Sequence, residues 1–464
     1  MRFTSASFIW CLLGLAFLFS RVYSVDKLPL FSDEAYAIVR ANEIRQGEPL
    51  LGMVKNTTQP IFIWLVALFQ LLPMSQVSSG RLVSTVGGLV MALVLARASS
   101  KLIKPEAAVV TFILTSILPF AFFYDRTVLF ESLTSMFISA SLLFPVVFTP
   151  LAILTKQTGW LTLPLAIGVN WKQPKVVIKT LLAAVAIPFM VWLIAFNGIN
   201  GITNTMGSKA AAPLSLSASL KPNLLRAKLW LEAYITIPIL ILSTIGGLIE
   251  AINIFRKKNI SSLLIIAVWT MGVIFLEAGV ARIFYPRYLY PIVIGIVLLA
   301  VRGFLALSSK IVSLRIPLLF FIIFPALRLD YAIATRPETA AIALEDKYQF
   351  FEDWTSGAGS QELISKTYDI SLKQSQPVVV YVEEENSYYV TLRDDKRLRE
   401  IKVQVAKWLV DPLADIPQTV LDDLSQSLII RNRNPDIPDS WPVELILEVP
   451  KTASRSVYLY RIVK

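Results

Sequence analysis

Histidine is absent from this chain of 464 residues, and cysteine occurs once, at Cys11. Without histidine, a general acid or base has to be a carboxylate, a lysine or a tyrosine, and a zinc site with histidine ligands is excluded. A single cysteine also excludes internal disulfides and metal sites built from several thiolates. Carboxylates alone can hold magnesium or manganese, so the sequence permits a divalent metal but requires no cofactor.

Charged residues are scarce and unevenly distributed. They make up 17% of the chain, against about 25% in soluble globular proteins. Residues 1–334 hold 12 of the 33 acids and 28 of the 44 bases, so this part is basic, whereas residues 335–464 are mildly acidic. The basic excess suits membrane lipids and phosphate groups. Nucleic acid is not an expected partner, because no polar domain carries the positive charge.

Apolar runs fill residues 1–334, and a membrane-spanning helix needs roughly 20 such residues. They predict a polytopic α-helical membrane domain with about 10–11 transmembrane helices. Residues 1–23 resemble a signal peptide without a small-residue cleavage site, so we expect an uncleaved first helix. Residues 60–73 are short and bounded by prolines, which favours an interfacial segment. The candidate spans are residues 8–23, 82–98, 107–123, 128–148, 151–169, 176–196, 234–254, 262–280, 288–307 and 316–329.

Basic clusters orient these helices, because Lys and Arg are enriched in cytoplasmic loops. The N-terminus is then cytoplasmic, whereas the first loop (residues 24–59) and the C-terminal domain are extracytoplasmic. Between Glu131 and Lys156 there is room for one crossing, and the downstream clusters require another. Either a helix of about 20–25 residues is absent near residues 143–150, which we favour, or the downstream topology is inverted. The clusters are Arg97, Lys101 and Lys104; Arg256, Lys257 and Lys258; and Arg302, Lys310 and Arg315.

The C-terminal part, residues 335–464, alternates strand-like and helix-like pieces and predicts a small soluble α/β domain. Residues 403–410 fit either a helix or a strand. The predicted strands are residues 377–382, 425–430, 443–449 and 457–463.

An acidic pair, Asp33 and Glu34, stands in the first predicted outer loop. Ser32 before it is a good N-cap, and both acids then lie in the first helical turn. The run that follows, residues 35–45, is amphipathic, so we expect this helix to lie flat on the membrane surface. The pair is a candidate catalytic site, although two acids at a helix N-terminus also have a purely structural explanation.

Glu131 lies within an apolar helix, where an ionisable group is costly and usually functional. Thr127, Ser135 and Ser139 align with it at a spacing of four, which predicts a polar stripe facing the interior. Asp125 and Arg126 precede this stripe and are further candidates for substrate contacts. The alternative is an internal Arg–carboxylate pair that holds the helices together.

Several cations stand near the predicted membrane face, where a lipid phosphate would lie. Lys156 interrupts an apolar run, and Arg282 and the Arg287-Tyr288 pair precede a later span. Arginine binds phosphate in a bidentate manner, and lysine acts as a point charge. Each cation taken singly is also explained by snorkelling or by its effect on topology.

Together these segments resemble glycosyltransferase family 39, the protein O-mannosyltransferase and aminoarabinose-transferase-like branch of the integral-membrane GT-C fold. The resemblance covers roughly residues 1–330, and the acidic pair is its most specific element. The matching segments, in order, are PLFSDEAY (29–36), IRQG (44–47), TQPIFIW (58–64), GRL (80–82), Arg126-x4-Glu131, LTK (154–156) and Arg287-Tyr288.

The resemblance implies transfer of a sugar from a polyprenyl-phosphate donor to an acceptor hydroxyl at the outer face, with inversion and with Asp33 as the catalytic base. The acceptor is a protein, a lipid or an envelope glycan. The family often has Lys before the prolines after the first loop, where this chain has Gln59. Alternatives are a transporter or flippase of lipid-linked sugars and a non-catalytic scaffold of the cell envelope. The implied substrate contacts are Glu34, Gln59, Asp125, Arg126 and Glu131, and the implied lipid-phosphate contacts are Lys156, Arg282, Arg287 and Tyr288.

Overall fold

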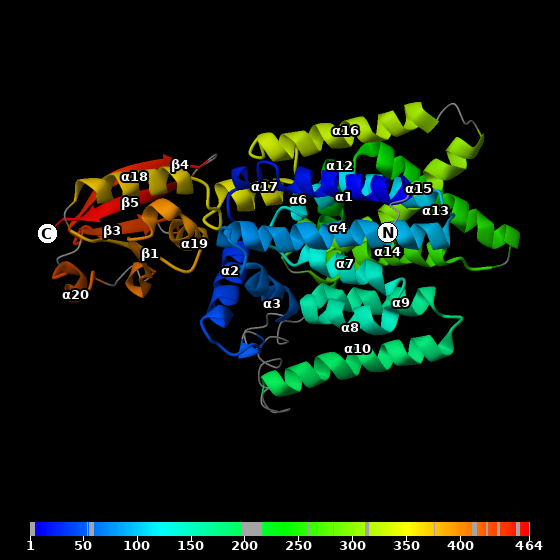
Figure 1. Cartoon of the computed structure of the whole chain (residues 1–464), viewed down its shortest axis with the longest axis horizontal. Helices are drawn as coiled ribbons and strands as arrows, with labels where there is room; N and C mark the ends of the chain where they lie inside the picture. Colours follow the sequence, from blue (N-terminus) through cyan, green and yellow to red (C-terminus); the bar gives the residue numbers. More distant parts are fainter. Residues whose placement is uncertain are drawn as a thin grey trace. The chain divides into compact units, whose positions relative to one another are not determined.

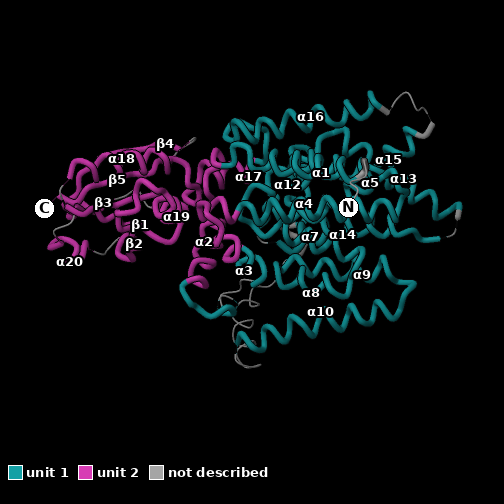
Figure 2. The backbone as a smooth tube through the Cα atoms, in the orientation of Figure 1, with its two compact units in different colours: residues 1–25, 46–65, 81–343 teal, residues 26–45, 66–80, 344–464 magenta. Residues whose placement is uncertain are grey.

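The computed structural model divides into two compact units (Figures 1 and 2). The first unit comprises residues 1–25, 46–65 and 81–343, and the second comprises residues 26–45, 66–80 and 344–464. The second unit therefore joins the acidic part of the first loop to the C-terminal domain. The structure describes residues 5–52, 54, 60–196, 216–257, 259–281, 283–310, 315–374, 376–410, 415–423, 426–433, 437–451 and 455–463.

Helices make up the first unit. Among the described residues, seven helices are long and apolar enough to cross a membrane, and three shorter apolar helices accompany them. The predicted multi-pass helical membrane protein is thus confirmed. The long helices are α1 (Ser5–Val22), α4 (Gln76–Leu102), α10 (Pro174–Ala195), α13 (Ile237–Lys257), α14 (Ser262–Val280), α15 (Val293–Lys310, preceded by η4, Pro286–Ile292) and α16 (Arg315–Thr335); the others include α3 (Pro60–Phe69), α5 (Ala107–Ile117), α6 (Pro119–Tyr124) and α12 (Leu216–Ile235).

The prediction of one span over residues 128–148 and another over 151–169 is wrong. The chain instead forms α7 (Glu131–Ser141), α8 (Pro145–Thr155), η3 (Gln157–Leu161) and α9 (Thr162–Val169). Phe144 leaves the helical conformation and Pro145 begins the next helix, because proline fits the first helical position but not a helix interior. Each 11-residue helix is about 16 Å long, roughly half of the ~30 Å hydrocarbon core.

Helices α7 and α8 form an antiparallel hairpin. Glu131 begins α7 and Lys156 directly follows α8, yet their side chains form an ion pair. The rings of Phe137 and Phe148 pack across the hairpin, 6.0 Å apart. The chain therefore returns to the end at which it entered, so the predicted sidedness of the downstream charge clusters does not require a missing helix near residues 143–150.

Helices α13 and α15 pack at very short range, as is common for small residues in membranes. A Cβ atom on Gly246 would lie 2.0 Å from the carbonyl oxygen of Leu299, and one on Gly303 would lie 2.2 Å from that of Leu242. The same two helices are joined by an ion pair of 2.7 Å between Arg302 and Glu250. A buried acid in this pair of helices is thus compensated by a cation of the neighbouring helix.

The second unit contains a five-stranded mixed sheet with the order β2-β1-β3-β5-β4. Strand β1 pairs in parallel with β2 and β3, and β5 pairs antiparallel with β3 and β4. All four predicted strands are confirmed, while residues 403–410 divide between β2 and a short 3-10 helix, η8. The strands are β1 (Val378–Val382), β2 (Lys402–Val405), β3 (Gln426–Arg431), β4 (Val443–Pro450) and β5 (Ser456–Ile462), and the other elements include η1 (Val25–Lys27), α2 (Ser32–Arg45), α17 (Leu344–Lys347), η6 (Tyr348–Glu352), α18 (Ser360–Lys373), α19 (Ser387–Asp394), η7 (Lys396–Leu398), η8 (Lys407–Leu409) and α20 (Gln418–Leu421).

Strand β1 is the centre of this domain, because all five of its residues are buried. Val378, Val380 and Val382 pack in one apolar cluster with residues of α18 and α19, and Val379 and Tyr381 pack in a second cluster on the other face. A strand buried on both faces reads as a continuous apolar run, which is why the sequence identified it.

Contacts within the first unit also define which helix ends lie together. The Arg81 side chain near the start of α4 donates to the carbonyl oxygen of Val25, 2.6 Å away, just beyond the end of α1. Helix α4 has 27 residues and is about 40 Å long, so Arg97 lies near its opposite end.

The hairpin predicts the sidedness of its two ends. In a Cys11→Ser background, Tyr23→Cys and Gln157→Cys should react with a membrane-impermeant maleimide from the same side of sealed vesicles, and Arg97→Cys should react from the other. All three replaced residues are exposed. If Gln157→Cys instead reacted from the same side as Arg97→Cys, residues 131–156 would cross the membrane once.

Candidate functional site

The acidic pair begins α2, and its two members have different environments. Asp33 is exposed, whereas Glu34 is fully buried. The Glu34 carboxylate accepts a hydrogen bond of 2.8 Å from the backbone N–H of Phe31, the return bond of a capping box. Ser32 does not cap the helix as predicted, because its hydroxyl donates to the Thr355 carbonyl oxygen, 2.9 Å away.

The apolar face of α2 is buried by protein of its own unit, not by lipid as predicted. Ala35, Ala37 and Ile38 have no exposed surface. Amphipathicity alone does not distinguish a helix at a membrane surface from one packed on a domain, and here the C-terminal domain supplies the partner surface. Asp33 is therefore the member of the pair that faces outward.

A loop of the C-terminal domain, residues 353–357, holds the start of α2. The Thr355 carbonyl accepts from the Ser32 backbone N–H at 2.9 Å, and the Gly357 N–H donates to the Leu30 carbonyl at 2.8 Å. A Cβ atom at Gly357 would lie 2.7 Å from that Leu30 oxygen, so glycine allows this close approach. The position of Asp33 thus depends on a segment more than 300 residues away in the sequence.

Lys451, the residue directly after β4, binds the same loop with its side chain. Its ammonium is 2.9 Å from the Asp353 carbonyl oxygen, 3.0 Å from the Ser356 carbonyl oxygen and 2.6 Å from Oδ1 of Asn432. Lys451 is 7% exposed, and burial lowers its pKa to about 7. Three acceptors around a buried amine form a complete hydrogen-bond set for an ammonium group.

In the first unit, four predicted residues come together at the start of α7, the end of α8 and in η4. Glu131, buried, is ion-paired with Lys156. The Lys156 ammonium lies 5.4 Å from the centre of the Tyr288 ring, and the Arg287 guanidinium lies 5.8 Å from the same ring. The cations Lys156 and Arg287 and the polar side chains of Glu131 and Tyr288 therefore lie in one small region. Two neighbouring cations are what binding of a phosphate group requires.

Glu277 is a member of this group that the sequence analysis did not select. It lies in α14, and Lys156 is near enough for its charge to act on the Glu277 carboxylate. An acid inside a 19-residue apolar helix was the signal available in the sequence. Lys156 is therefore ion-paired with Glu131 and lies near a second carboxylate, that of Glu277.

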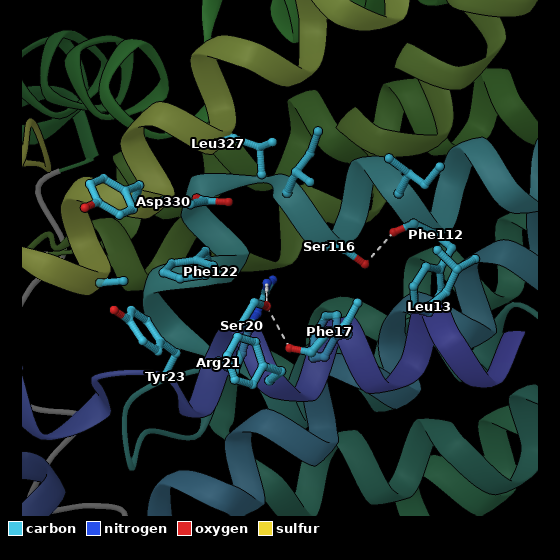
Figure 3. A pocket seen from close by; sticks show the side chains of 16 residues that line it. Leu13, Phe17, Ser20, Arg21, Tyr23, Phe112, Ser116, Phe122, Leu327 and Asp330 are labelled. Atoms are coloured by element: carbon cyan, nitrogen blue, oxygen red, sulfur yellow. Dashed lines mark hydrogen bonds between the residues drawn. The ribbon is translucent and has the colours of Figure 1, made fainter. Parts of the chain in front are cut away.

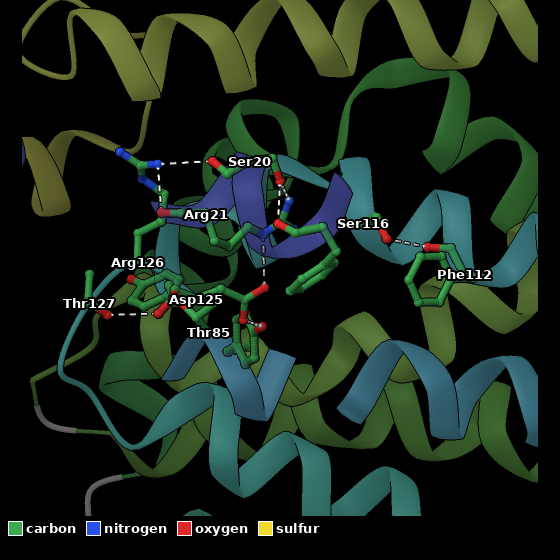
Figure 4. A network of polar contacts seen from close by, with 11 residues as sticks. Ser20, Arg21, Thr85, Phe112, Ser116, Asp125, Arg126 and Thr127 are labelled. Atoms are coloured by element: carbon green, nitrogen blue, oxygen red, sulfur yellow. Dashed lines mark hydrogen bonds and ion pairs between the residues drawn. The ribbon is translucent and has the colours of Figure 1, made fainter. Parts of the chain in front are cut away.

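Arg126 closes the end of α1 (Figure 4). Its guanidinium donates to the carbonyl oxygens of Ser20 and Arg21 in the last turn of α1, at 3.2 and 3.0 Å. It also donates to those of Tyr23 and Ser24 just after the helix, at 2.8 and 3.1 Å. The last carbonyl groups of a helix have no partner within the helix. Arg126 therefore has a structural role at the end of α1, which could not be predicted from the sequence.

Asp125 is the centre of a second buried contact set, beside Arg126. It lies 3.5 Å from Nε of Arg21 and accepts a hydrogen bond of 3.1 Å from the Tyr290 hydroxyl (Figure 4). A Cβ atom at Gly88 would lie 2.4 Å from this carboxylate, so glycine makes room for it. Arg21 was not among the predicted site residues.

Two predicted residues, Gln59 and Arg282, lie outside the described residues. Among the residues that the structure describes, no group of three or more Asp, Glu or Cys side chains is arranged to hold a metal ion.

Two solved structures share the fold of nearly the whole chain. Crystal structures of ArnT from Cupriavidus metallidurans align with it in the apo state (TM-score 0.56, 14% identity, 98% of this chain and 98% of that chain) and bound to undecaprenyl phosphate (TM-score 0.57, 13% identity, 97% and 98%). No protein-family model matches the chain, and no curated protein matches its sequence. The likeness is one of fold, and membership of family 39 is not supported by a match.

The Lys451 anchor yields a prediction about α2. In Lys451→Met, the two carbonyls and Asn432 lose their buried donor, so amide exchange in residues 28–36 and 353–359 should become about tenfold faster or more. Hydrogen–deuterium exchange of the full-length protein measures this. Lys373→Met, at an exposed position of α18, is the control; equal exchange in both variants would show that Lys451 does not hold the loop.

The hairpin ion pair yields a prediction about stability. Lys156→Met leaves Glu131 buried without its cation, which should cost about 3–5 kcal/mol and lower the thermal unfolding midpoint in detergent. Adding Glu131→Gln should restore most of the loss, because a neutral amide needs no counter-charge. The exposed Lys175→Met is the control. A double variant as unstable as Lys156→Met would exclude charge compensation as the cause.

Proposed function

We propose that this chain, which has the GT-C fold of integral-membrane glycosyltransferases, transfers a sugar from a polyprenyl-phosphate donor to an acceptor hydroxyl. The observation that carries the proposal is the fold match over 97% of the chain to a protein bound to undecaprenyl phosphate. The order of the motifs around the acidic pair and the cations supports the same reaction. The transfer takes place at the outer face, with the N-terminus cytoplasmic and the C-terminal domain extracytoplasmic.

Asp33 is the proposed general base. It is the exposed member of the acidic pair, while Glu34 is engaged in capping α2. Asp33 accepts the proton of the acceptor hydroxyl as that oxygen bonds to the anomeric carbon. The bond from the anomeric carbon to the phosphate oxygen breaks on the opposite face, its electron pair leaves with the polyprenyl phosphate, and the configuration inverts.

Lys156 and Arg287 are the proposed contacts to the departing phosphate. Positive charge placed where negative charge develops is usually the largest single contribution to such catalysis. Arg287 offers a planar set of donors, and Tyr288 lies between the two cations. Glu131 and Glu277 hold the Lys156 charge in place, and Glu131 retains an oxygen without a hydrogen-bond partner, which suits a sugar hydroxyl.

Asp125 and Arg126 support this arrangement without touching the donor in our proposal. Arg126 donates to four carbonyl oxygens at and just after the end of α1, and Asp125 contacts Arg21 and Tyr290. Both precede α7, whose first residue is Glu131. They therefore fix the segment from which the proposed substrate contacts start.

Sugar transfer in membranes tests the proposal. Wild-type protein, Asp33→Asn and the matched control Asp26→Asn, an exposed acid of the same loop, are supplied with labelled polyprenyl-phosphate hexoses and with protein, lipid and envelope-glycan acceptors. Loss of a general base should lower transfer by about a hundredfold or more in Asp33→Asn only. Wild-type protein that moves the donor across vesicles without transferring sugar would favour a flippase, and equal transfer by both variants would exclude Asp33 as the base.

A further inference from the structure

A crevice lined mostly by apolar side chains opens between α1, α5 and α16 (Figure 3). Its volume is about 570 Å³, within the range that holds a chain-like small molecule. Leu13 and Phe112 line one end of it, and Tyr23 and Asp330 line the other. The crevice is therefore amphipathic along its length, as a membrane lipid is.

Asp330 is the exceptional group in this crevice. It lies in α16, is 5% exposed, and its Oδ1 atom has no hydrogen-bond partner. Arg21 also lines the crevice, but no ion pair joins Asp330 to any cation among the described residues. Arg21 is paired with Asp125, and Arg126 is engaged with the carbonyl oxygens of α1.

A carboxylate at membrane depth without a counter-charge is costly, and the other acids of comparable burial in the first unit have one. Glu131 is paired with Lys156 and Glu250 with Arg302. Asp330 lacks such a partner among the described residues but faces a space that a lipid can enter. A ligand that brings a cation with N–H donors would complete this site.

We propose that the crevice binds a zwitterionic glycerophospholipid with a primary ammonium head group. The ammonium pairs with Asp330, and one acyl chain lies along the apolar walls formed by residues such as Leu13 and Ile113. A primary ammonium offers three N–H donors to the carboxylate, whereas a quaternary choline offers none. An anionic head group would bring a second negative charge to Asp330 without a neutralising cation.

The phosphate next to the ammonium has donors at the same end of the crevice. Tyr23 and Tyr331 both line it and are 48% and 68% exposed, so their hydroxyl groups are accessible to a head group at this end. The proposed lipid differs from the polyprenyl donor, and its site shares none of the residues assigned to phosphate departure. The lipid-binding proposal can therefore be tested independently of sugar transfer.

Native mass spectrometry of the full-length protein, released from nanodiscs with equal amounts of phosphatidylethanolamine, phosphatidylcholine and phosphatidylglycerol, tests the proposal. We expect wild-type protein to retain phosphatidylethanolamine about tenfold over the other two, the ratio that one charge-assisted pair supports. Asp330→Asn should lose this preference. Equal retention of all three lipids by wild-type protein, or preference for the anionic lipid, would overturn the proposal.

A second pair of variants tests the crevice without changing its charge. Ala16 lines the crevice and Leu15, its neighbour on α1, does not, although both are exposed. Ala16→Phe should fill the space and lower phosphatidylethanolamine retention about tenfold or more, while Leu15→Phe should retain it as wild-type protein does. Undiminished retention by Ala16→Phe would place the lipid elsewhere and overturn the site.

Discussion

The compensation of buried charge is the constraint on which the membrane unit depends. Its apolar body contains few acids. The pairs Glu250–Arg302 and Asp125–Arg21 join segments that are distant in sequence, and the pair Glu131–Lys156 joins the two ends of the α7–α8 hairpin. Removing one partner of such a pair is far costlier than never having had the pair. Of these pairs, Glu131–Lys156 has the largest effect on the path of the chain, because it joins the two ends of the α7–α8 hairpin and so brings Lys156 next to Glu131.

The sequence predicted the parts that follow from periodicity and composition. The multi-pass helical body and the strands of the C-terminal domain have local signals. Glu131, Lys156, Arg287 and Tyr288 were each selected on a local signal, but the contact between Glu131 and Lys156 was not predicted. The hairpin was missed because hydropathy sums are the same for one long helix and for two short antiparallel ones; only Pro145 marks the break. The carbonyl acceptors of Arg126 were also invisible, because backbone groups carry no sequence signature.

The C-terminal domain has a definite task within its own unit. The loop that follows η6 pairs with the residues before α2, and Lys451 holds this loop through two carbonyls. In the sequence, Ser32 and Glu34 indicate a helix start that needs no other segment. In the structure, the start of α2 also depends on the loop of the C-terminal domain. Sequence reasoning about the acidic pair could not predict this dependence, since the contact joins residues separated by 323 positions.

That separation has a consequence for biosynthesis. Ribosomes add roughly 5–20 residues per second, so the 323 positions between Ser32 and Thr355 take on the order of 16–65 s to translate. Throughout this time the apolar side chains of α2 and the ring of Phe31, which later packs 5.2 Å from Phe350, lack the neighbours that the C-terminal domain supplies. A chaperone or the bilayer surface must cover these side chains until the last quarter of the polypeptide is synthesised. A prematurely terminated chain would insert its membrane helices, but α2 would not reach its native packing.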